Sequence, residues 1–228
     1  MASGFAMTFL VLLAAIDMFW TPARVRMTER AITAGDGEAR TSLYQITIGY
    51  IWPMAGVAAL ILAVGFGGAA FGFRAPDFSH LHGMYAGVLA GSIGGLALSY
   101  VATLWPRKGE AGALQRTFDL LAPTTPRERK WFAIVAISAG ICEEIIYRAL
   151  PFAMLALWWP GGDPRWYAVI VGGFFGLAHV YQGVAGIVAT ALLGTVLGLV
   201  YAGTGSLFAA MVLHAVVDLR LLLARPRR

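Results

Sequence analysis

Long apolar runs, each followed by a short polar stretch, set the pattern of this chain. An α-helix needs about 20 such residues to cross the hydrocarbon core of a membrane. The pattern therefore predicts an all-α, polytopic transmembrane helix bundle that forms a single domain over residues 1–228. The predicted spans are residues 4–20, 44–70, 81–105, 126–150, 167–181, 184–202 and 206–223.

Residues 152–159 leave the number of spans open between seven and eight. Pro151 should end or kink the fourth span, and the apolar residues after it form either the rest of that span or a further short segment. With seven spans, four Lys and Arg residues in loop 21–43, six in loop 106–130 and four at the C-terminal end lie on one side, which is fourteen of the 17. The positive-inside rule then places the C-terminus in the cytoplasm.

The composition agrees with a multi-pass protein of the cell membrane, in contact with the lipid bilayer. Hydrophobic residues make up 59% of the chain and charged residues 13%, which is about half the charged fraction of a soluble domain. The net charge of +5 does not indicate nucleic acid, because the basic residues flank the apolar runs. Cys142 is the single cysteine, so the sequence holds no disulfide framework and no pair of cysteine metal ligands. No basic residue precedes residues 4–20, so we interpret them as a retained span rather than a signal peptide.

Two local patterns predict structure in the most basic loop. Thr125, Pro126 and Glu128 have the spacing of a capping box with proline at the first helical position. Leu114, Phe118 and Leu121 recur at i, i+4 and i+7, which predicts a short amphipathic helix at the membrane interface.

Other small motifs are interpreted as structural. Gly87, Gly91 and Gly95 repeat every four residues and predict a smooth stripe where another helix packs closely; Gly186, Gly194 and Gly198 are further small contact positions. Asp17 lies near the end of the first span and is interpreted as an interfacial acid facing headgroups or water. His80 and His82 are two residues apart, so they would not share a helix face and do not indicate a metal site.

The ionisable residues inside the spans are the candidates for chemistry, because a charge at the bilayer centre costs about 2.5–3.5 kcal/mol on insertion scales. Besides Asp17 they are Glu143, Glu144, Arg148, His179, His214 and Asp218. Glu144 and Arg148 are i, i+4 and can pair on one helix face, either as a purely structural ion pair or as support for a site. Glu143 points about 100° away from Glu144. It is therefore left as an unpaired carboxylate and a candidate general base.

The two histidines have neighbours at helical spacing. His214 and Asp218 are i, i+4, so Asp218 could orient the imidazole or share a ligand with it. His179 follows Phe175 by four residues, and the phenyl ring should pack beside it. For a lone histidine in a span, a hydrogen bond to a neighbouring helix is the alternative interpretation.

Other hydrolase signatures are missing from the sequence. It contains no His-Glu-x-x-His zinc motif, no Gly-x-Ser-Gly and, within a span, no Gly-x-Gly-Asp. We interpret Cys142 as a packing residue rather than a nucleophile. A Glu/His site that activates water remains, for which we expect no cofactor and no metal. A metal-dependent version with Glu143, His179 and His214 as ligands is an alternative.

Three motifs in this order resemble a known family. Glu143-Glu144-x-x-x-Arg148, Phe175-x-x-x-His179 and His214-x-x-x-Asp218 are similar to the signature of the CPBP family, the CAAX-prenyl-protease and bacteriocin-processing membrane proteins also called Abi or Rce1-like. The resemblance covers about residues 125–220. The flanking residues resemble those of bacterial members.

The resemblance implies a glutamate-type intramembrane endopeptidase that acts on a membrane-associated peptide or protein. Glu143 and His179 would activate a water, His214 and Asp218 would stabilise the oxyanion, and Glu144, Arg148 and Phe175 would support them. The eukaryotic prenyl-protein members have Asn where this chain has Asp218, and an ionised Asp cannot donate a hydrogen bond.

Two other functions would fit the same pattern of residues. One is an inactive membrane scaffold or binding protein of the same fold. The other is a proton-coupled transporter, since intramembrane Glu and His also form proton relays, although the two halves of the sequence show no inverted repeat.

Overall fold

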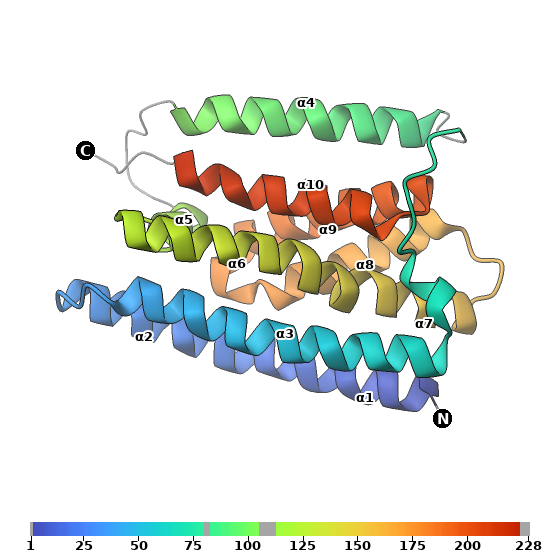
Figure 1. Cartoon of the computed structure of the whole chain (residues 1–228), viewed down its shortest axis with the longest axis horizontal. Helices are drawn as coiled ribbons and strands as arrows, with labels where there is room; N and C mark the ends of the chain where they lie inside the picture. The colour runs from blue at the N-terminus through green and yellow to red at the C-terminus, as the bar shows by residue number, and fades with distance from the viewer. Residues whose placement is uncertain (1, 80–82, 105–112, 224–228) are drawn as a thin grey trace.

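The computed structural model describes residues 2–79, 83–104 and 113–223, and all regular secondary structure in these ranges is helical (Figure 1). The α-helices are α1 (Ala2–Ala15), α2 (Thr21–Thr33), α3 (Ala39–Gly65), α4 (Met84–Leu104), α5 (Ala113–Leu121), α6 (Pro126–Glu144), α7 (Leu150–Trp158), α8 (Pro164–Ala178), α9 (Gly183–Thr204) and α10 (Leu207–Leu219). Two π-helical turns, η1 (Ile16–Trp20) and η3 (Ile145–Ala149), and three 3-10 turns, η2 (Gly68–Phe71), η4 (Val180–Gln182) and η5 (Arg220–Leu223), complete the set. His80 and His82 lie outside the described residues.

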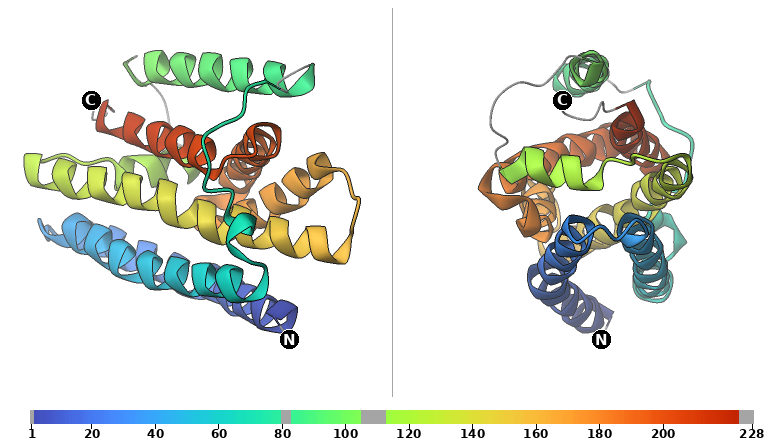
Figure 2. Two further views of the ribbon diagram at one scale, coloured as in Figure 1. Left: turned by 45° about the vertical axis from the view of Figure 1, so that its right-hand side comes forward. Right: turned by 90° about the vertical axis from the view of Figure 1, so that its left-hand side faces the viewer.

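The long helices run back and forth along one direction, as a membrane bundle requires (Figures 1 and 2). The α2–α3 turn, the start of α6 and the end of α10 lie at one end of the bundle, and the start of α1 and the α7–α8 loop lie at the other. Each of the seven predicted spans coincides with a helix or with a run of consecutive helical segments. The predicted all-α bundle is therefore confirmed.

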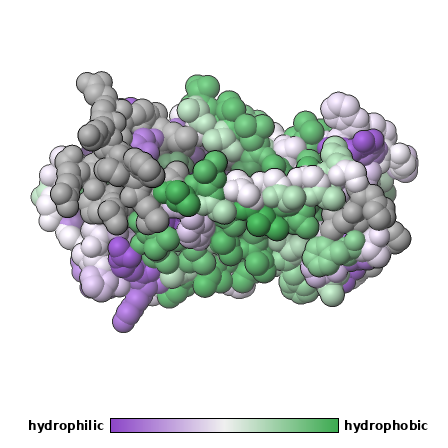
Figure 3. All heavy atoms as spheres, turned by 90° about the horizontal axis from the view of Figure 1, so that it is seen from above, coloured by the Kyte–Doolittle hydropathy of each residue, from purple (hydrophilic) through white to green (hydrophobic). Residues whose placement is uncertain are grey.

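The surface agrees with a position in a membrane. On the face drawn in Figure 3, hydrophobic residues cover the middle and hydrophilic residues gather toward both ends. Among the described residues, four helical stretches are long and apolar enough to cross a membrane by length and composition: Ser3–Thr33, Ala39–Gly65, Met84–Val101 and Val180–Thr204. The helical run from α6 to α7 contains the charged motif, and α8 and α10 are shorter.

Two proline positions correct the sequence analysis. Residues 21–33 were expected in a polar loop, yet α1, η1 and α2 form one continuous helical run through Pro22. Likewise Pro151 does not end the fourth span, because α6, η3 and α7 continue to Trp158. Residues 152–158 thus belong to the fourth span, as the seven-span alternative expected.

The reason is the π-helical turn before each proline. Proline lacks an N–H and its ring clashes with the carbonyl four residues earlier in a regular α-helix. Immediately before each proline a backbone hydrogen bond spans five residues instead of four. The N–H of Thr21 donates to the oxygen of Ile16, and the N–H of Leu150 donates to the oxygen of Ile145. The wider turn shifts the carbonyls away from the ring, and the helix proceeds.

Glycines decide which helices pack most closely. A Cβ atom added to Gly194 of α9 would lie 3.0 Å from Cα of Gly172 in α8, and one added to Gly198 would lie 2.9 Å from Cβ of Ala168. These positions confirm the predicted contacts of Gly194 and Gly198. The stripe Gly87, Gly91 and Gly95 was wrongly predicted to pack, because no atom of the described residues lies within 4 Å of the Cβ position at any of the three. The helix that carries the stripe, α4, lies on the outside of the bundle (Figure 2).

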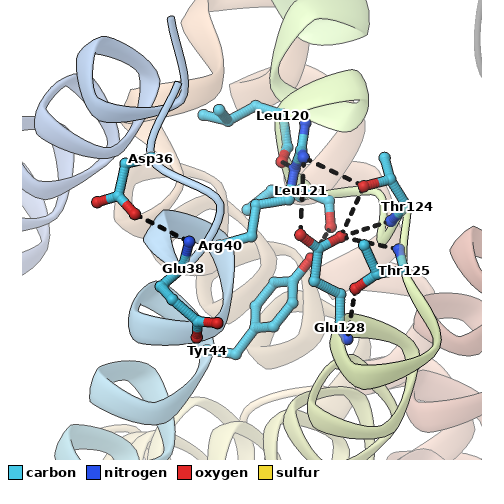
Figure 4. Close-up of polar contacts among 9 residues, drawn as sticks. All are labelled: Asp36, Glu38, Arg40, Tyr44, Leu120, Leu121, Thr124, Thr125 and Glu128. Atoms are coloured by element: carbon cyan, nitrogen blue, oxygen red, sulfur yellow. Dashed lines mark hydrogen bonds and ion pairs between the residues drawn. The ribbon is translucent and has the colours of Figure 1, made fainter. Parts of the chain in front are cut away.

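The predicted capping box ties three segments together at one end of the bundle (Figure 4). The Thr125 hydroxyl accepts from the Glu128 N–H at 3.2 Å, and the Glu128 carboxylate accepts from the Thr125 N–H at 3.2 Å. From α3, Arg40 donates to the Leu120 carbonyl at 2.8 Å and lies 3.9 Å from the same carboxylate. The predicted amphipathic helix is present as α5, and its C-terminal carbonyls are thereby joined to α3.

The contacts of the capping box predict that alanine substitutions of two glutamates at this end of the bundle will change stability by different amounts. Glu128→Ala removes a carboxylate that is 4% exposed and accepts three hydrogen bonds of 3.2 Å or less from Thr124 and Thr125. We expect the free energy of unfolding in detergent to fall by about 1–3 kcal/mol. The control is Glu38→Ala. Glu38 pairs with Arg127, and both side chains are exposed, so the substitution should change the free energy of unfolding by less than about 0.5 kcal/mol. Equal losses for both variants would contradict the role assigned to the capping box.

Candidate active site

Three helices bring the candidate residues together, and a glycine sets the distance between two of them. A Cβ added to Gly140 in α6 would lie 2.8 Å from Cβ of Ala215 and 2.9 Å from the backbone oxygen of Met211 in α10. Only a glycine allows α6 and α10 to approach this closely. One turn further along α6, Glu144 consequently meets His214 of α10.

His214 is the centre of the cluster, with carboxylates around both ring nitrogens. Its Nδ1 lies 2.7 Å from Oε1 of Glu144. Its Nε2 lies 3.8 Å from Oε2 of Glu143 and 3.7 Å from Oδ2 of Asp218. A carboxylate accepts, so Nδ1–H donates to Glu144. The expected neighbour Asp218 is present, but Glu144 is the closer partner, and the sequence analysis missed it.

Glu144 and Arg148 form the predicted i, i+4 pair. Nε of Arg148 lies 3.3 Å from Oε2 of Glu144, and both side chains are 0% exposed. The guanidinium also lies over the ring of Phe175, 4.2 Å from its centroid. Glu144 therefore neutralises Arg148 with one oxygen and holds His214 with the other, and neither Glu144 nor Arg148 reaches the cavity surface.

Phe175 positions His179 as well. Nδ1 of His179 lies 2.8 Å from the backbone oxygen of Phe175. Because a carbonyl only accepts, Nδ1 carries the proton, and Nε2 of the neutral ring is left as an acceptor. The Phe175 ring lies between the two histidines, with centroids 4.5 Å from His179 and 5.8 Å from His214. This confirms the predicted packing of Phe175 against His179.

Four of the candidates open onto one cavity of about 460 Å³: Glu143, His179, His214 and Asp218. The side chain of Glu143 is 18% exposed, against 0% for its neighbour Glu144. Glu143 and the two imidazoles thus face a common space between α6, α8 and α10. Within the described part of the chain, no group of three His, Cys, Asp or Glu side chains is arranged to hold a metal ion.

The first helix contributes a residue that the sequence analysis misplaced. Asp17 was interpreted as an interfacial acid, but it is 6% exposed and lines the same cavity. The Tyr147 hydroxyl donates to its Oδ2, and the Tyr50 hydroxyl donates to its Oδ1 at 3.4 Å. The Tyr147 ring packs in turn against Phe175, with centroids 5.5 Å apart. The position of Asp17 inside an apolar run was the one available signal, and its partner is 130 residues away.

The comparisons with known proteins agree with the motifs. Residues 126–220 match the family described as type II CAAX prenyl endopeptidase Rce1-like. This part of the chain is therefore similar to the Rce1-like family. The match begins with the first residue of α6 and ends just after α10, so it contains every candidate from Glu143 to Asp218. No curated protein and no solved structure matches the chain. The Rce1-like family is a protease family, and the match supports a membrane protease of the CAAX type in general terms.

The close approach at Gly140 predicts opposite effects for two Gly→Ala substitutions. In a helix, alanine is more favourable than glycine by about 1 kcal/mol. Gly140→Ala should nevertheless lower the thermal stability in detergent, because the new methyl group would force α10 away from α6. Gly91→Ala is the control, since nothing lies within 4 Å of its Cβ position, and it should leave stability unchanged or raise it. Tolerance of Gly140→Ala with no loss would show that α6 and α10 do not need this spacing.

Proposed function

We propose that the protein is an intramembrane endopeptidase that hydrolyses a peptide bond in a membrane-associated peptide or protein with a Glu/His-activated water. The observation that carries the proposal is the shared cavity of Glu143, His179, His214 and Asp218 inside an apolar bundle. The match of residues 126–220 to the Rce1-like family supports the class of reaction. The catalytic core is the segment 125–220 within a single membrane domain.

Water activation is assigned to Glu143 and His179. Glu143 is the one carboxylate of its pair that reaches the cavity, and it accepts the proton of the attacking water. Nε2 of His179, left as an acceptor by the bond of Nδ1 to Phe175, fixes the second hydrogen of that water. The hydroxide equivalent then attacks the peptide carbonyl carbon, and the proton held by Glu143 passes to the leaving amine.

Oxyanion stabilisation is assigned to Nε2 of His214. Its Nδ1–H is already directed at Glu144, so Nε2 is the nitrogen that faces the cavity. Carboxylates lie near both nitrogens, and a doubly protonated ring can donate from Nε2 to the developing oxyanion. In this arrangement Asp218 stabilises the imidazolium from 3.7 Å and need not donate a hydrogen bond itself. An ionised Asp at this position is therefore compatible with the mechanism.

Glu144, Arg148 and Phe175 support these groups without reaching the substrate. Arg148 lies over Phe175, which holds His179, while Glu144 holds His214. Glu143 and Glu144 thus have separate tasks despite their adjacent positions. The charge distribution favours a C-terminus in the cytoplasm, and the resemblance of the flanking residues to bacterial members favours a bacterial plasma membrane. We assign the chemistry to these side chains without a metal.

The test is to profile membrane proteins and peptides in cells that make the wild-type protein, Glu143→Ala or His179→Ala. An uncleaved substrate should accumulate with either variant, and its rate of cleavage should fall by about 10²–10⁴-fold, the usual contribution of a general base. The matched control is Glu29→Ala, which removes an exposed carboxylate of α2 and should process normally. Cleavage by the purified wild-type protein should persist in the presence of a chelator.

Unchanged processing by well-expressed Glu143→Ala and His179→Ala would reject the protease mechanism. The cluster would then hold helices together in a scaffold protein, and Glu143→Gln would lower stability without the loss of a specific product. Ion flux through proteoliposomes that contain the purified protein would instead identify a transporter.

A further inference from the structure

Asp17 is a buried acid that the proposed reaction does not use. It lies in η1, within a helical run that precedes the segment matched to the Rce1-like family. An acidic side chain inside an apolar span is costly, and well-packed hydrophobic residues often stabilise a protein as well as buried charged groups do. Asp17 therefore needs a reason beyond the packing of helices, and the contacts of its carboxylate supply one.

The two oxygens of Asp17 accept from tyrosines on two different helical runs. The Tyr147 hydroxyl of η3 donates to Oδ2, and the Tyr50 hydroxyl of α3 donates to Oδ1 at 3.4 Å, which is long for a bond between two oxygens. Tyr147 is 5% exposed. Its hydroxyl thus holds η3 to η1 inside the bundle, whereas Tyr50 contributes a weaker contact.

The ring of Tyr147 carries this constraint to Phe175. The two rings pack edge to face, with centroids 5.5 Å apart and planes inclined by 68°. Phe175 is 1% exposed, and a Cβ added to Gly194 of α9 would lie 3.0 Å from its Cδ1, so the ring has no space to move toward α9. Tyr147 and α9 together restrict its position.

Phe175 in turn determines the orientation of His179. Its backbone oxygen accepts from Nδ1 of His179 at 2.8 Å, and the centroids of the two rings are 4.5 Å apart. Tyr50 has no such connection. Its ring packs against Trp20, with centroids 5.5 Å apart, and the described structure shows no ring contact between Tyr50 and Phe175.

We propose that Asp17 is a positioning residue for His179. Through its hydrogen bond to Tyr147 it fixes the ring that packs against Phe175, and Phe175 holds the imidazole in the orientation that leaves Nε2 as an acceptor. Buried hydrogen bonds of this kind make a core rigid when all their members are satisfied. This inference rests on the proposed protease function, in which Nε2 of His179 fixes the attacking water.

The experiment locates the proton on His179 directly, so that its outcome does not depend on hydrolysis. Full-length protein with isotope-labelled histidine is prepared in detergent, and NMR places the proton of each neutral imidazole on Nδ1 or Nε2. The signals of His179 are identified among the four histidines by their loss in His179→Gln. In the wild-type protein we expect one form, with the proton on Nδ1, because this form donates to the Phe175 carbonyl.

Two tyrosine substitutions distinguish positioning from a general loss of packing. Tyr147→Phe and Tyr50→Phe each remove one hydroxyl that donates to Asp17, but of the two rings it is that of Tyr147 that packs against Phe175. Tyr147→Phe should allow a second form of His179, with the proton on Nε2, to reach a population comparable with the first. Tyr50→Phe should leave the single form unchanged.

Substitutions of Asp17 extend the comparison. Asp17→Ala removes both acceptors and should produce the same second form of His179 as Tyr147→Phe does. Asp17→Asn retains an oxygen that accepts from Tyr147 and should restore the single form in large part.

Cleavage in cells is the second readout. The substrate that accumulates with Glu143→Ala should be cleaved about 10–100-fold more slowly by Tyr147→Phe, since a small displacement of a reacting group has an effect of this size. Tyr50→Phe should cleave it at the wild-type rate.

Two results would overturn the inference: a His179 signal that stays unchanged in folded Tyr147→Phe, or a signal that Tyr50→Phe changes as much as Tyr147→Phe does. Size-exclusion profiles establish folding, and Tyr147→Phe, which removes a single oxygen atom, decides the matter if Asp17→Ala does not fold. Normal processing by Glu143→Ala would reject the protease mechanism, while the NMR comparison would still decide whether Asp17 orients His179. The two proposals can therefore fail separately.

Discussion

The buried carboxylate of Glu144 is the group on which the geometry of the site depends. It lies 3.3 Å from the guanidinium of Arg148, one turn further along the same helical run, and 2.7 Å from an imidazole nitrogen of His214 in α10. Removal of one partner from a buried ion pair costs about 3–5 kcal/mol, because the other charge is left uncompensated. Glu144 cannot relax toward water, since it is completely buried. The position of His214, and with it the shape of the cavity, follows from this constraint.

The π-helical turns have a similar structural role on the two sides of the cavity. Each widens the backbone just before a proline, and each carries one partner of the hydrogen bond between Tyr147 and Asp17. A wide turn directs a side chain away from the register of a regular α-helix, and such turns are frequent at functional sites. In this chain they allow two long helical runs to continue through a proline while their polar side chains point at one another.

Interactions within a single helix were predictable from the sequence, whereas the contacts between helices that build the site were not. The pair Glu144–Arg148 and the capping box at Thr125 follow from spacing alone, and both are present. The contact of Glu144 with His214 depends on how closely α6 approaches α10, and the spacing of residues along one helix does not predict that distance.

Residue type was a poor guide at two places where the outcome depended on a neighbouring helix. The stripe of Gly87, Gly91 and Gly95 resembles a packing surface but has no close contact with any described residue, while Gly140, which belongs to no repeat, makes a close contact. Asp17 was misplaced because an acid near the end of an apolar run usually faces water, and Tyr147, distant in sequence, provides the partner that permits burial. The proposed roles of Glu143, His179, His214 and Asp218 rest on their shared cavity and await the experiments above.

The bond between Tyr147 and Asp17 has a consequence for how the molecule is divided. It joins the segment matched to the Rce1-like family to a helix more than a hundred residues before that segment begins. An excised fragment 126–220 would keep the reactive side chains but would lose α1, α2 and α3, which supply the opposite wall. The cavity would become an open groove exposed to lipid, and Tyr147 would be left as an unpaired donor. The sequence match thus covers one part of the chain, whereas the cavity is lined by residues from before that part as well as within it.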